Sequence, residues 1–384
     1  MSPVNLPPQA RAKWAKTLEA RTPEERLRAL QEFLSSIPDH KGASKLRAHV
    51  KHQIAVLRRT IEEQRTRRRG GGGPSFSVEK EGAAQIVLLG FTNAGKSSLL
   101  QALTNAKPEV SEQPYTTKYP APGMMDYEDL KFQLVEAPPL RGLERDAPTL
   151  SLARNADALM LVVDLAEDPI AQLSAMVEEL RDVGIVVEKP KASIEIERQT
   201  SGGVKIVVMG RLMHCTEQDV AKLLTSYGMR HALIKITGEA SLDDVEDALL
   251  RKPVYKPTMV LANKADLPGS KDKLKRLEAY LAGKIPLIAT SAVQGVGRED
   301  LGKEVFRVLD LIRVYTKEPG EPPSNEPLVV RRGSTVLEVA KRIHKQLGRS
   351  FKYAKVWSKR LPFSPQRVGP SFILEDRDVV EIKA

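Results

Sequence analysis

Short apolar segments alternate with segments of helical periodicity from residue 76 to about residue 183. Residues 84–89 are mostly apolar and partly β-branched, which predicts a buried parallel strand, and residues 98–103 predict a helix soon after it. Residues 131–135 and 257–262 have the same strand character. This alternation predicts an α/β fold built on a doubly wound sheet.

The first 73 residues carry only helical periodicity. Thr22-Pro23-Glu24-Glu25 has the residue types of a helix start, and apolar residues follow at helical spacing up to Ile37. A second amphipathic pattern begins near Ser44 and continues to Ile61. The two patterns predict an antiparallel helical hairpin. The glycines of 70–73 follow it and would form either a hinge or a packed turn.

Residues 185–252 interrupt the main α/β pattern. Two β-branched segments, 194–198 and 204–208, flank a Gly-containing turn and predict a β-hairpin. A helix from Thr216, a strand over 232–236 and a helix capped by Ser241 are predicted next. We expect a small inserted α/β subdomain.

The last part of the chain follows a Pro- and Gly-containing linker, residues 318–323. A strand, a helix with the capping box Thr335–Glu338 and further strands are predicted after it, which is the order of a ubiquitin-like β-grasp domain. The predicted domains are 1–73, 74–184 together with 253–317, 185–252, and 326–384.

The composition indicates the cellular compartment of the protein. The 384 residues include one cysteine, Cys215, which excludes an internal disulfide and agrees with a reducing cytosol. The longest apolar stretch, 156–166, contains two aspartates and is shorter than the about 20 residues that cross a bilayer. The N-terminus has no signal-peptide pattern. We therefore expect a cytoplasmic protein with no membrane partner.

The net charge of +11 is concentrated at the two ends. Residues 1–73 hold 16 Lys and Arg against 7 Asp and Glu, and residues 326–384 hold 13 against 6. The part between them holds 31 against 36 and is slightly acidic. Basic ends are typical of proteins that bind RNA or another polyanion, although they also occur as solvated surfaces. Nothing indicates DNA specificity.

Residues 90–97 (Gly-Phe-Thr-Asn-Ala-Gly-Lys-Ser) match the phosphate-loop motif G-x-x-x-x-G-K-[ST] at every fixed position. The loop lies between a predicted strand and a predicted helix, so its backbone N–H groups would face a polyphosphate. Lys96 would reach the β- and γ-phosphates, and the Ser97 hydroxyl would bind Mg²⁺. The predicted nucleotide contacts in the loop are Phe91, Thr92, Asn93, Ala94, Gly95, Lys96, Ser97 and Ser98.

The segment 263–266 (Asn-Lys-Ala-Asp) selects the base. The Asp266 carboxylate can accept both hydrogens on N1 and N2 of guanine, a donor pair that adenine lacks. Asn263 would contact the base edge and tie down the phosphate loop, and the stem of Lys264 would cover the ring. The backbone of Ser291 and Ala292 would contact the guanine O6. We therefore predict GTP and GDP as ligands.

Two segments between the loop and the base-reading residues are predicted switches. One threonine of Tyr115-Thr116-Thr117 should complete the Mg²⁺ shell, with Thr117 favoured over Thr116. The second switch follows the strand 131–135 and reads Glu136-Ala137-Pro138-Pro139. Glu136 would hold a Mg²⁺-bound water, and Pro138 would lie against the nucleotide.

This second switch lacks two groups that usually act on the γ-phosphate. Pro139 has no N–H to donate, and Leu140 stands where a water-orienting glutamine is common. Arg141 and Glu144 are weaker polar candidates. Asn93 is placed either to help hold K⁺ beside the β- and γ-phosphates, or only to shape the loop.

Taken together, these motifs resemble those of the developmentally regulated GTP-binding proteins, a branch of the Obg-related GTPases. The resemblance includes the helical segment with its glycine run, 115–117, 263–266 and the insert. It extends to a TGS domain through 366–369 and 374–380. It implies a cytoplasmic GTPase that works with ribosomes or RNA in translation. The family's Asp-x-Pro-Gly is Glu136-Ala137-Pro138-Pro139 here, and Asn93 and Ala94 replace the common Ser and Val.

Two functions are therefore expected. The first is a GTP-hydrolysing switch that is slow alone and stimulated by K⁺ or by a partner protein, with Lys96, Thr117 and Glu136 as its catalytic residues. The second is a guanine-nucleotide-binding RNA or ribosome adaptor with negligible hydrolysis.

The C-terminal region offers a surface for RNA. Alternation should put the aromatic residues of 351–357 on one sheet face as a stacking surface and the lysines on the other. In the other arrangement, the aromatics fill the core and the lysines are solvated.

Overall fold

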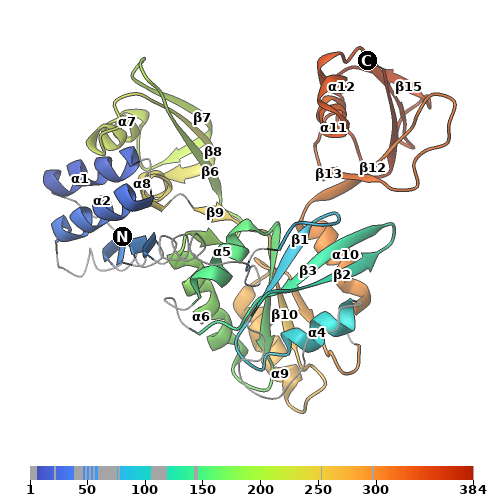
Figure 1. Ribbon diagram of the computed structural model, residues 1–384, viewed down its shortest axis with the longest axis horizontal. Coiled ribbons are helices and arrows are strands. Elements are labelled where there is room, and N and C mark those ends of the chain that lie inside the picture. The colour runs from blue at the N-terminus through green and yellow to red at the C-terminus, as the bar shows by residue number, and fades with distance from the viewer. Residues whose placement is uncertain are drawn as a thin grey trace, which may run out of the picture. The chain divides into compact units, whose positions relative to one another are not determined.

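The structure is a computed structural model that describes residues 7–20, 23–38, 46–47, 50–51, 53–54, 57–58, 76, 78–104, 119–141, 146–251, 253–295 and 298–383. Figure 1 shows the helices and strands of the chain, which divides into two compact units. One spans residues 1–77, 138–155 and 170–256, and the other spans 78–137, 156–169 and 257–384. Within the described residues, no helix has both the length and the apolar character needed to cross a membrane.

The second unit contains a six-stranded sheet in the order β11-β10-β4-β1-β3-β2. All neighbouring strands pair in parallel except β2 and β3, which form an antiparallel hairpin. The strand bounds are β1 Gln85–Leu89, β2 Ala121–Tyr127, β3 Leu130–Glu136, β4 Ala158–Asp164, β10 Thr258–Asn263 and β11 Leu287–Ala289. The predicted α/β doubly wound sheet is confirmed.

Helices α4 (Lys96–Leu103), α9 (Ser270–Leu281) and α10 (Arg298–Val308) belong to the same unit. Every residue of β1, β4 and β10 is buried, which explains why these segments are almost wholly apolar. Side chains of α4 and α10 share one hydrophobic core with the sheet.

The C-terminal part of this unit is a second sheet of five strands, in the order β13-β12-β16-β14-β15. With α11 (Val336–Ile343) and α12 (Lys345–Arg349) it forms the predicted β-grasp domain. The strand bounds are β12 Leu311–Thr316, β13 Leu328–Arg331, β14 Tyr353–Trp357, β15 Gln366–Val368 and β16 Asp378–Lys383. The structure places β12 in this sheet, whereas the sequence assigned its residues to the end of the GTPase domain.

The faces of β14 differ from both sequence expectations. Ala354 and Val356 point into the core, while Tyr353, Lys355 and Trp357 share the opposite, partly exposed face. Residues two apart lie on the same side of a strand, so a lysine between two aromatics at this spacing must lie beside them. The predicted separation of aromatics from lysines is therefore wrong for this strand.

The first unit contains the inserted subdomain, a three-stranded sheet in the order β6-β8-β7. Its elements are β6 Ala192–Arg198, β7 Val204–Met213, α7 Glu217–Ser226, β8 Ala232–Ser241 and α8 Leu242–Arg251. The predicted hairpin between 194–198 and 204–208 is wrong, because β8 lies between these two strands. Ala232, Ile234 and Ile236 of β8 are fully buried, and the central position pairs both edges of the most buried of the three strands.

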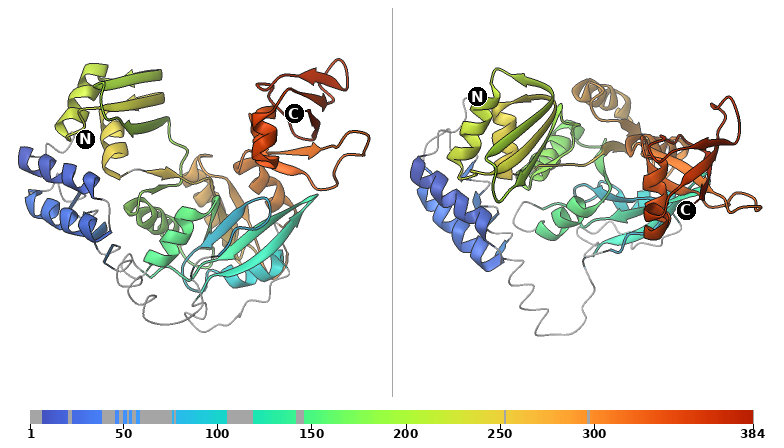
Figure 2. Two further views of the ribbon diagram at one scale, coloured as in Figure 1. Left: turned by 45° about the horizontal axis from the view of Figure 1, so that its top comes forward. Right: turned by 90° about the horizontal axis from the view of Figure 1, so that it is seen from above.

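Two N-terminal helices, α1 (Pro8–Glu19) and α2 (Pro23–Ser36), lie beside the helices of the insert (Figure 2). Trp14 and Phe33 contact each other with ring centroids 5.0 Å apart, and both belong to one hydrophobic core with residues of α7, β8 and α8. The sequence predicted α2 but not α1. The second predicted helix is described only in part, and its described residues between 46 and 58 are helical. Leu46, Val50 and Ile54 belong to the same hydrophobic core.

The remaining elements of the first unit are α5 (Ala147–Asn155), α6 (Pro169–Asp182) and the short parallel pair β5 (Ile185–Val186) and β9 (Val254–Tyr255). The strands β5 and β9 pair where the insert leaves and rejoins the main chain, so the two connections run side by side. The glycine run 70–73 lies outside the described residues.

Gly302 of α10 should not tolerate a side chain. A Cβ atom at this position would lie 2.4 Å from Cδ2 of the Tyr127 ring on β2. Gly302→Ala should therefore lower the free energy of unfolding by about 1–2 kcal/mol, although alanine by itself favours a helix by about 1 kcal/mol. Urea denaturation measures this change, with exposed Lys303→Ala as the matched control. An unchanged or higher stability would show that α10 does not pack so closely on β2.

Candidate nucleotide-binding site

The phosphate loop joins the carboxyl end of β1 to the N-terminus of α4. Gly95 has φ +86°, and a Cβ atom there would lie 2.2 Å from the Asn263 Nδ2 atom. Gly90 allows an equally close approach, because its Cβ would lie 2.7 Å from the carbonyl oxygen of Val162. Both glycines are therefore required by contacts as well as by the motif. The loop ends at Lys96, the first residue of α4, so the positive end of this helix lies at the loop.

Lys96 is 5 % exposed and donates hydrogen bonds to two carbonyl oxygens of the loop, those of Gly90 at 3.0 Å and Phe91 at 2.9 Å. Burial lowers the pKa of Lys96 to about 8, and the charge of Glu136 partly opposes this effect. The ammonium group is thus held inside the loop by two carbonyl oxygens.

Ser97, near the start of α4, and Glu136, at the end of β3, are in direct contact. The Ser97 hydroxyl donates a hydrogen bond to Glu136 Oε1 at 2.6 Å. Glu136 is the last residue of β3, in register with Leu88 near the end of β1, and is 2 % exposed. The structure therefore brings the predicted Mg²⁺-binding hydroxyl and the predicted switch carboxylate together, although 39 residues separate them in the chain.

Asn263 ties the base-reading segment to the phosphate loop. Its Nδ2 atom donates to the carbonyl oxygen of Ala94 at 2.9 Å, and the hydroxyl of Thr290 donates to its Oδ1 atom at 3.4 Å. Asn263 and Thr290 are both buried. The predicted tie between Asn263 and the loop is thus present, and Thr290 is a further residue that holds it.

Asp164, at the end of β4, is a member of the site that the sequence analysis missed. The ammonium group of Lys264 donates to Asp164 Oδ2 at 2.6 Å, and the N–H of Ala166 donates to Oδ1 at 2.7 Å. Lys264 has φ +64°, a conformation that lysine seldom adopts. The signal in the sequence was weak: Asp164 ends a buried strand at the edge where ligands bind in such sheets.

The rest of the segment predicted to read the base lies beside the end of β11. The N–H of Ala265 donates to the carbonyl oxygen of Thr290 at 3.0 Å, which fixes 263–266 beside the end of β11. Ser291 is buried and Ala292 is half-buried, while the Asp266 side chain is exposed. A carboxylate on the surface beside a buried, hydrogen-bonded loop is available to a ligand.

The structure leaves some of the predicted site residues untested. Thr116 and Thr117, the predicted first switch, and Glu144 lie outside the described residues. Pro138 and Pro139 are buried, and their predicted relation to the nucleotide stays a prediction. The Arg141 N–H donates a hydrogen bond to Asp146 Oδ2 at 2.5 Å.

These contacts define the site of a P-loop protein. The sequence also matches three protein-family models over consecutive parts of the chain. They are a 50S ribosome-binding GTPase over 85–194, the C-terminal region of the MMR_HSR1 domain over 201–311, and a TGS domain over 312–384. The last match begins inside β12, in agreement with the place of this strand in the C-terminal sheet.

Curated relatives resemble the chain over nearly its whole length. An uncharacterised GTP-binding protein of Methanocaldococcus jannaschii is 34 % identical over 94 % of this chain and 92 % of its own. Developmentally-regulated GTP-binding protein 1 of Xenopus laevis is 30 % identical over 87 % and 91 %. Ribosome-interacting GTPase 1 of Saccharomyces cerevisiae is 30 % identical over 94 % and 99 %. The chain belongs to the developmentally regulated GTP-binding protein family of Obg-related GTPases.

Solved structures share less with the chain. The YchF GTPase of Schizosaccharomyces pombe is 16 % identical and covers 79 % of this chain and 99 % of its own, with a TM-score of 0.48. A GTP-binding protein of Pyrococcus horikoshii is 19 % identical and covers 78 % and 99 %, with a TM-score of 0.45. The family assignment therefore depends on the sequence relatives.

Proposed function

We propose that this GTP-binding protein is a switch that hydrolyses GTP to GDP slowly by itself and acts with ribosomes or structured RNA in the cytoplasm. The observation that carries the proposal is the arrangement of Lys96, Ser97, Glu136 and Asn263 around one loop. Each contributes a polar group held by hydrogen bonds. Glu136 and Asn263 lie at the ends of two strands, and Lys96 and Ser97 lie where the loop meets α4.

Ser97 and Glu136 suit a magnesium ion, because hydroxyl and carboxylate oxygens are the ligands that Mg²⁺ prefers. The described residues include no cluster of three or more His, Cys, Asp or Glu able to hold a metal ion. Nucleotide phosphates and water would supply the remaining ligands, with Ser97 and Thr117 as the protein ligands and Glu136 contacting a bound water. Such an ion neutralises charge that develops on the phosphates during transfer.

The guanine base would lie between Asp266, which accepts its N1 and N2 hydrogens, and the backbone of Ser291 and Ala292. The stem of Lys264 would cover the ring. The pairing of its ammonium group with Asp164 supports this role, because it holds the end of the side chain and so limits how the stem can move.

The slow rate is inferred from the second switch. Pro139 cannot donate a backbone hydrogen bond to the γ-phosphate. Glu136 is one methylene longer than the aspartate of the family, and its bond to Ser97 supports the view that the extra length is accommodated. Asn93 is exposed at the tip of the loop with φ +63°, a position from which its amide oxygen would help hold K⁺. Negligible hydrolysis, with an adaptor role, is the second candidate and is favoured by Pro139.

The contact with RNA or the ribosome is assigned to the basic ends, although residues 65–69 of the N-terminal end lie outside the described residues. In the C-terminal sheet, Lys355, Arg367 and Lys383 lie on the face that carries Tyr353 and Trp357. Arg367 covers the Tyr353 ring at 3.8 Å from its centroid. Because this ring already has a cation over it, phosphate contact by the basic groups is favoured over base stacking.

Asp266→Asn should change the base that is bound. The asparagine amide would face the N2 amino group of guanine with a donor, whereas it would match the C2 carbonyl of xanthine. Affinity for GTP should fall by about 100-fold or more and affinity for XTP should rise, as measured by competition with a fluorescent nucleotide. Asp272→Asn, which removes an exposed carboxylate from α9, is the control. Equal GTP affinity in the two variants would exclude Asp266 as the base reader.

Single-turnover hydrolysis separates the two candidate functions. GTP conversion should be slow in Na⁺ and faster in K⁺ or with ribosomes, and Asn93→Ala should remove the K⁺ effect. Pro139→Gly, which restores an N–H group, should raise the rate by about 10- to 100-fold. Lys96→Ala supplies the background rate. Conversion no faster than this background in every condition would refute hydrolysis and favour the adaptor.

RNA binding through the C-terminal sheet should weaken as salt rises. Fluorescence anisotropy with a short labelled RNA stem-loop would give the dependence of affinity on salt. The double variant Lys355→Gln with Arg367→Gln should lower the log–log slope by about 2, or one for each lost phosphate contact. Lys271→Gln with Lys275→Gln removes two exposed charges from α9 and should leave the slope unchanged. Equal slopes in the two double variants would exclude this face.

A further inference from the structure

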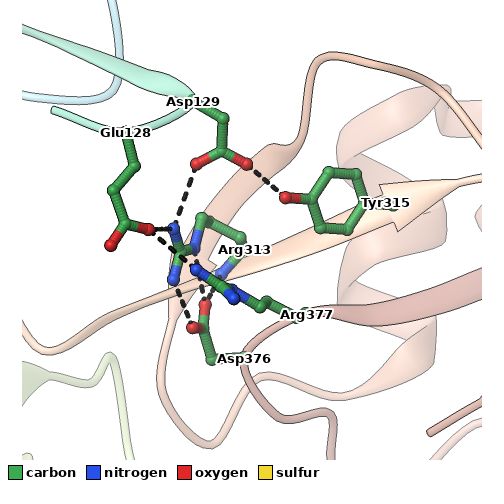
Figure 3. Close-up of polar contacts among 6 residues, drawn as sticks. All are labelled: Glu128, Asp129, Arg313, Tyr315, Asp376 and Arg377. Atoms are coloured by element: carbon green, nitrogen blue, oxygen red, sulfur yellow. Dashed lines mark hydrogen bonds and ion pairs between the residues drawn. The ribbon is translucent and has the colours of Figure 1, made fainter. Parts of the chain in front are cut away.

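A cluster of charged side chains joins the turn of the β2–β3 hairpin to the C-terminal sheet (Figure 3). Glu128 and Asp129 form the turn, Arg313 lies on β12, and Asp376 and Arg377 lie in the turn before β16. Arg313 is only 5 % exposed. A buried arginine is costly unless its donors are satisfied, so its partners determine what it holds together.

The guanidinium group of Arg313 reaches both sides of the junction. Its Nε and Nη2 atoms donate to the two carboxylate oxygens of Asp376 at 3.0 and 2.6 Å, a bidentate pair within the C-terminal domain. Its Nη1 atom donates to Asp129 at 3.0 Å and to Glu128, both on the hairpin turn. The Arg313 side chain therefore holds together the hairpin turn and the turn before β16, which are far apart in the sequence.

Two more residues of the C-terminal domain hold the same turn. The Tyr315 hydroxyl donates to Asp129, and Arg377 donates to Glu128 at 2.9 Å. The hydrogen bond from Arg313 is the largest effect that keeps the pKa of Glu128 below its usual value, so this carboxylate stays charged at neutral pH. The turn is thus bound by three donor side chains from one domain.

Two aromatic rings, those of Phe306 and Tyr127, pack beside the cluster of charged side chains. The Arg313 guanidinium lies over the Phe306 ring of α10, 5.1 Å from its centroid. The ring centroids of Phe306 and Tyr127, the last residue of β2, are 6.0 Å apart. Gly302 allows the close approach of α10 to the Tyr127 ring. The hairpin end, α10 and β12 are consequently packed as one body.

The β2–β3 hairpin lies between the two predicted switches in the sequence. Strand β2 begins at Ala121, soon after the predicted first switch, and β3 ends at Glu136, which accepts the hydrogen bond from Ser97 and begins the second switch. The two strands pair without interruption from Ala121 and Glu136 to Tyr127 and Leu130. A paired hairpin of this kind moves as a unit, so displacement at the switch end is carried to the turn.

We propose that Arg313 is a positioning residue that couples the segment between the two switches to the C-terminal domain. The bound nucleotide would then change the affinity of the C-terminal sheet for a partner. By reciprocity, a partner bound to that sheet would change the affinity for the nucleotide by the same factor. The inference rests on the proposed function as a GTP switch. Its physical basis is that the hairpin cannot move alone without breaking the two hydrogen bonds from Nη1 of the buried Arg313 to Glu128 and Asp129.

The test compares hydrogen exchange of the full-length protein bound to GDP and to a non-hydrolysable GTP analogue. Binding of both nucleotides is first measured by fluorescence titration. In the wild type, amide exchange in 311–316 and 375–380 should differ between the two nucleotides. Arg313→Gln should abolish that difference and keep the one in the hairpin, and it should change the ratio of the two affinities by about fivefold or more.

Arg332→Gln is the matched control. Arg332 also pairs with an aspartate at this junction, Asp310 at 3.0 Å, but both side chains are largely exposed, so this variant should keep the nucleotide-dependent difference. Asp129→Asn retains the shape of the turn and removes one charge, so it tests the same contact if Arg313→Gln does not fold. It should reduce the difference in the C-terminal sheet.

Three results would overturn the coupling. The first is exchange in the C-terminal sheet that is the same with both bound nucleotides in the wild type. The second is a difference that persists in full in Arg313→Gln or, if that variant does not fold, in Asp129→Asn. Either would leave the GTP site unaffected. The third is failure to bind either nucleotide, which would refute the proposed function together with the coupling.

Discussion

The parallel register of the buried strands β1, β3, β4 and β10 is the constraint on which the site depends. These strands end at the same edge of the sheet, with Leu88 opposite Glu136 and Asn263 opposite Asp164. Apolar burial sets this register, because each strand is almost wholly enclosed. The polar residues at the strand ends meet as a consequence, and they need no direct attraction to each other to do so.

Hydrogen bonds between protein groups hold the loop at this edge. Lys96 is held by two carbonyl oxygens of the loop, Ser97 by Glu136, and the Ala94 carbonyl oxygen by Asn263. A prearranged site loses less conformational entropy on binding than a flexible one. In the second switch, Pro139 has no backbone N–H to donate, and the proposed slow hydrolysis depends on this residue.

The added domains are joined to their neighbours by shared packing. The N-terminal helices share one hydrophobic core with the insert, so the two regions that looked separate in the sequence form a single folding body. The C-terminal sheet begins with β12, directly after α10, and its Arg313 is paired with the hairpin turn. The proposed coupling follows from this short connection, because a flexible linker at 309–311 would not hold the guanidinium in place.

Local patterns of the sequence determined the phosphate loop, the base-reading segment, the buried strands and the capped helices, since each depends on neighbours within a few residues. The tertiary structure decided which distant segments meet. It placed β8 between β6 and β7, paired Lys264 with Asp164 at a separation of 100 residues, and brought Arg313 to Asp129 at a separation of 184. Periodicity specifies which face of an element is buried but not the partner that covers it, and these partners are fixed only by topology.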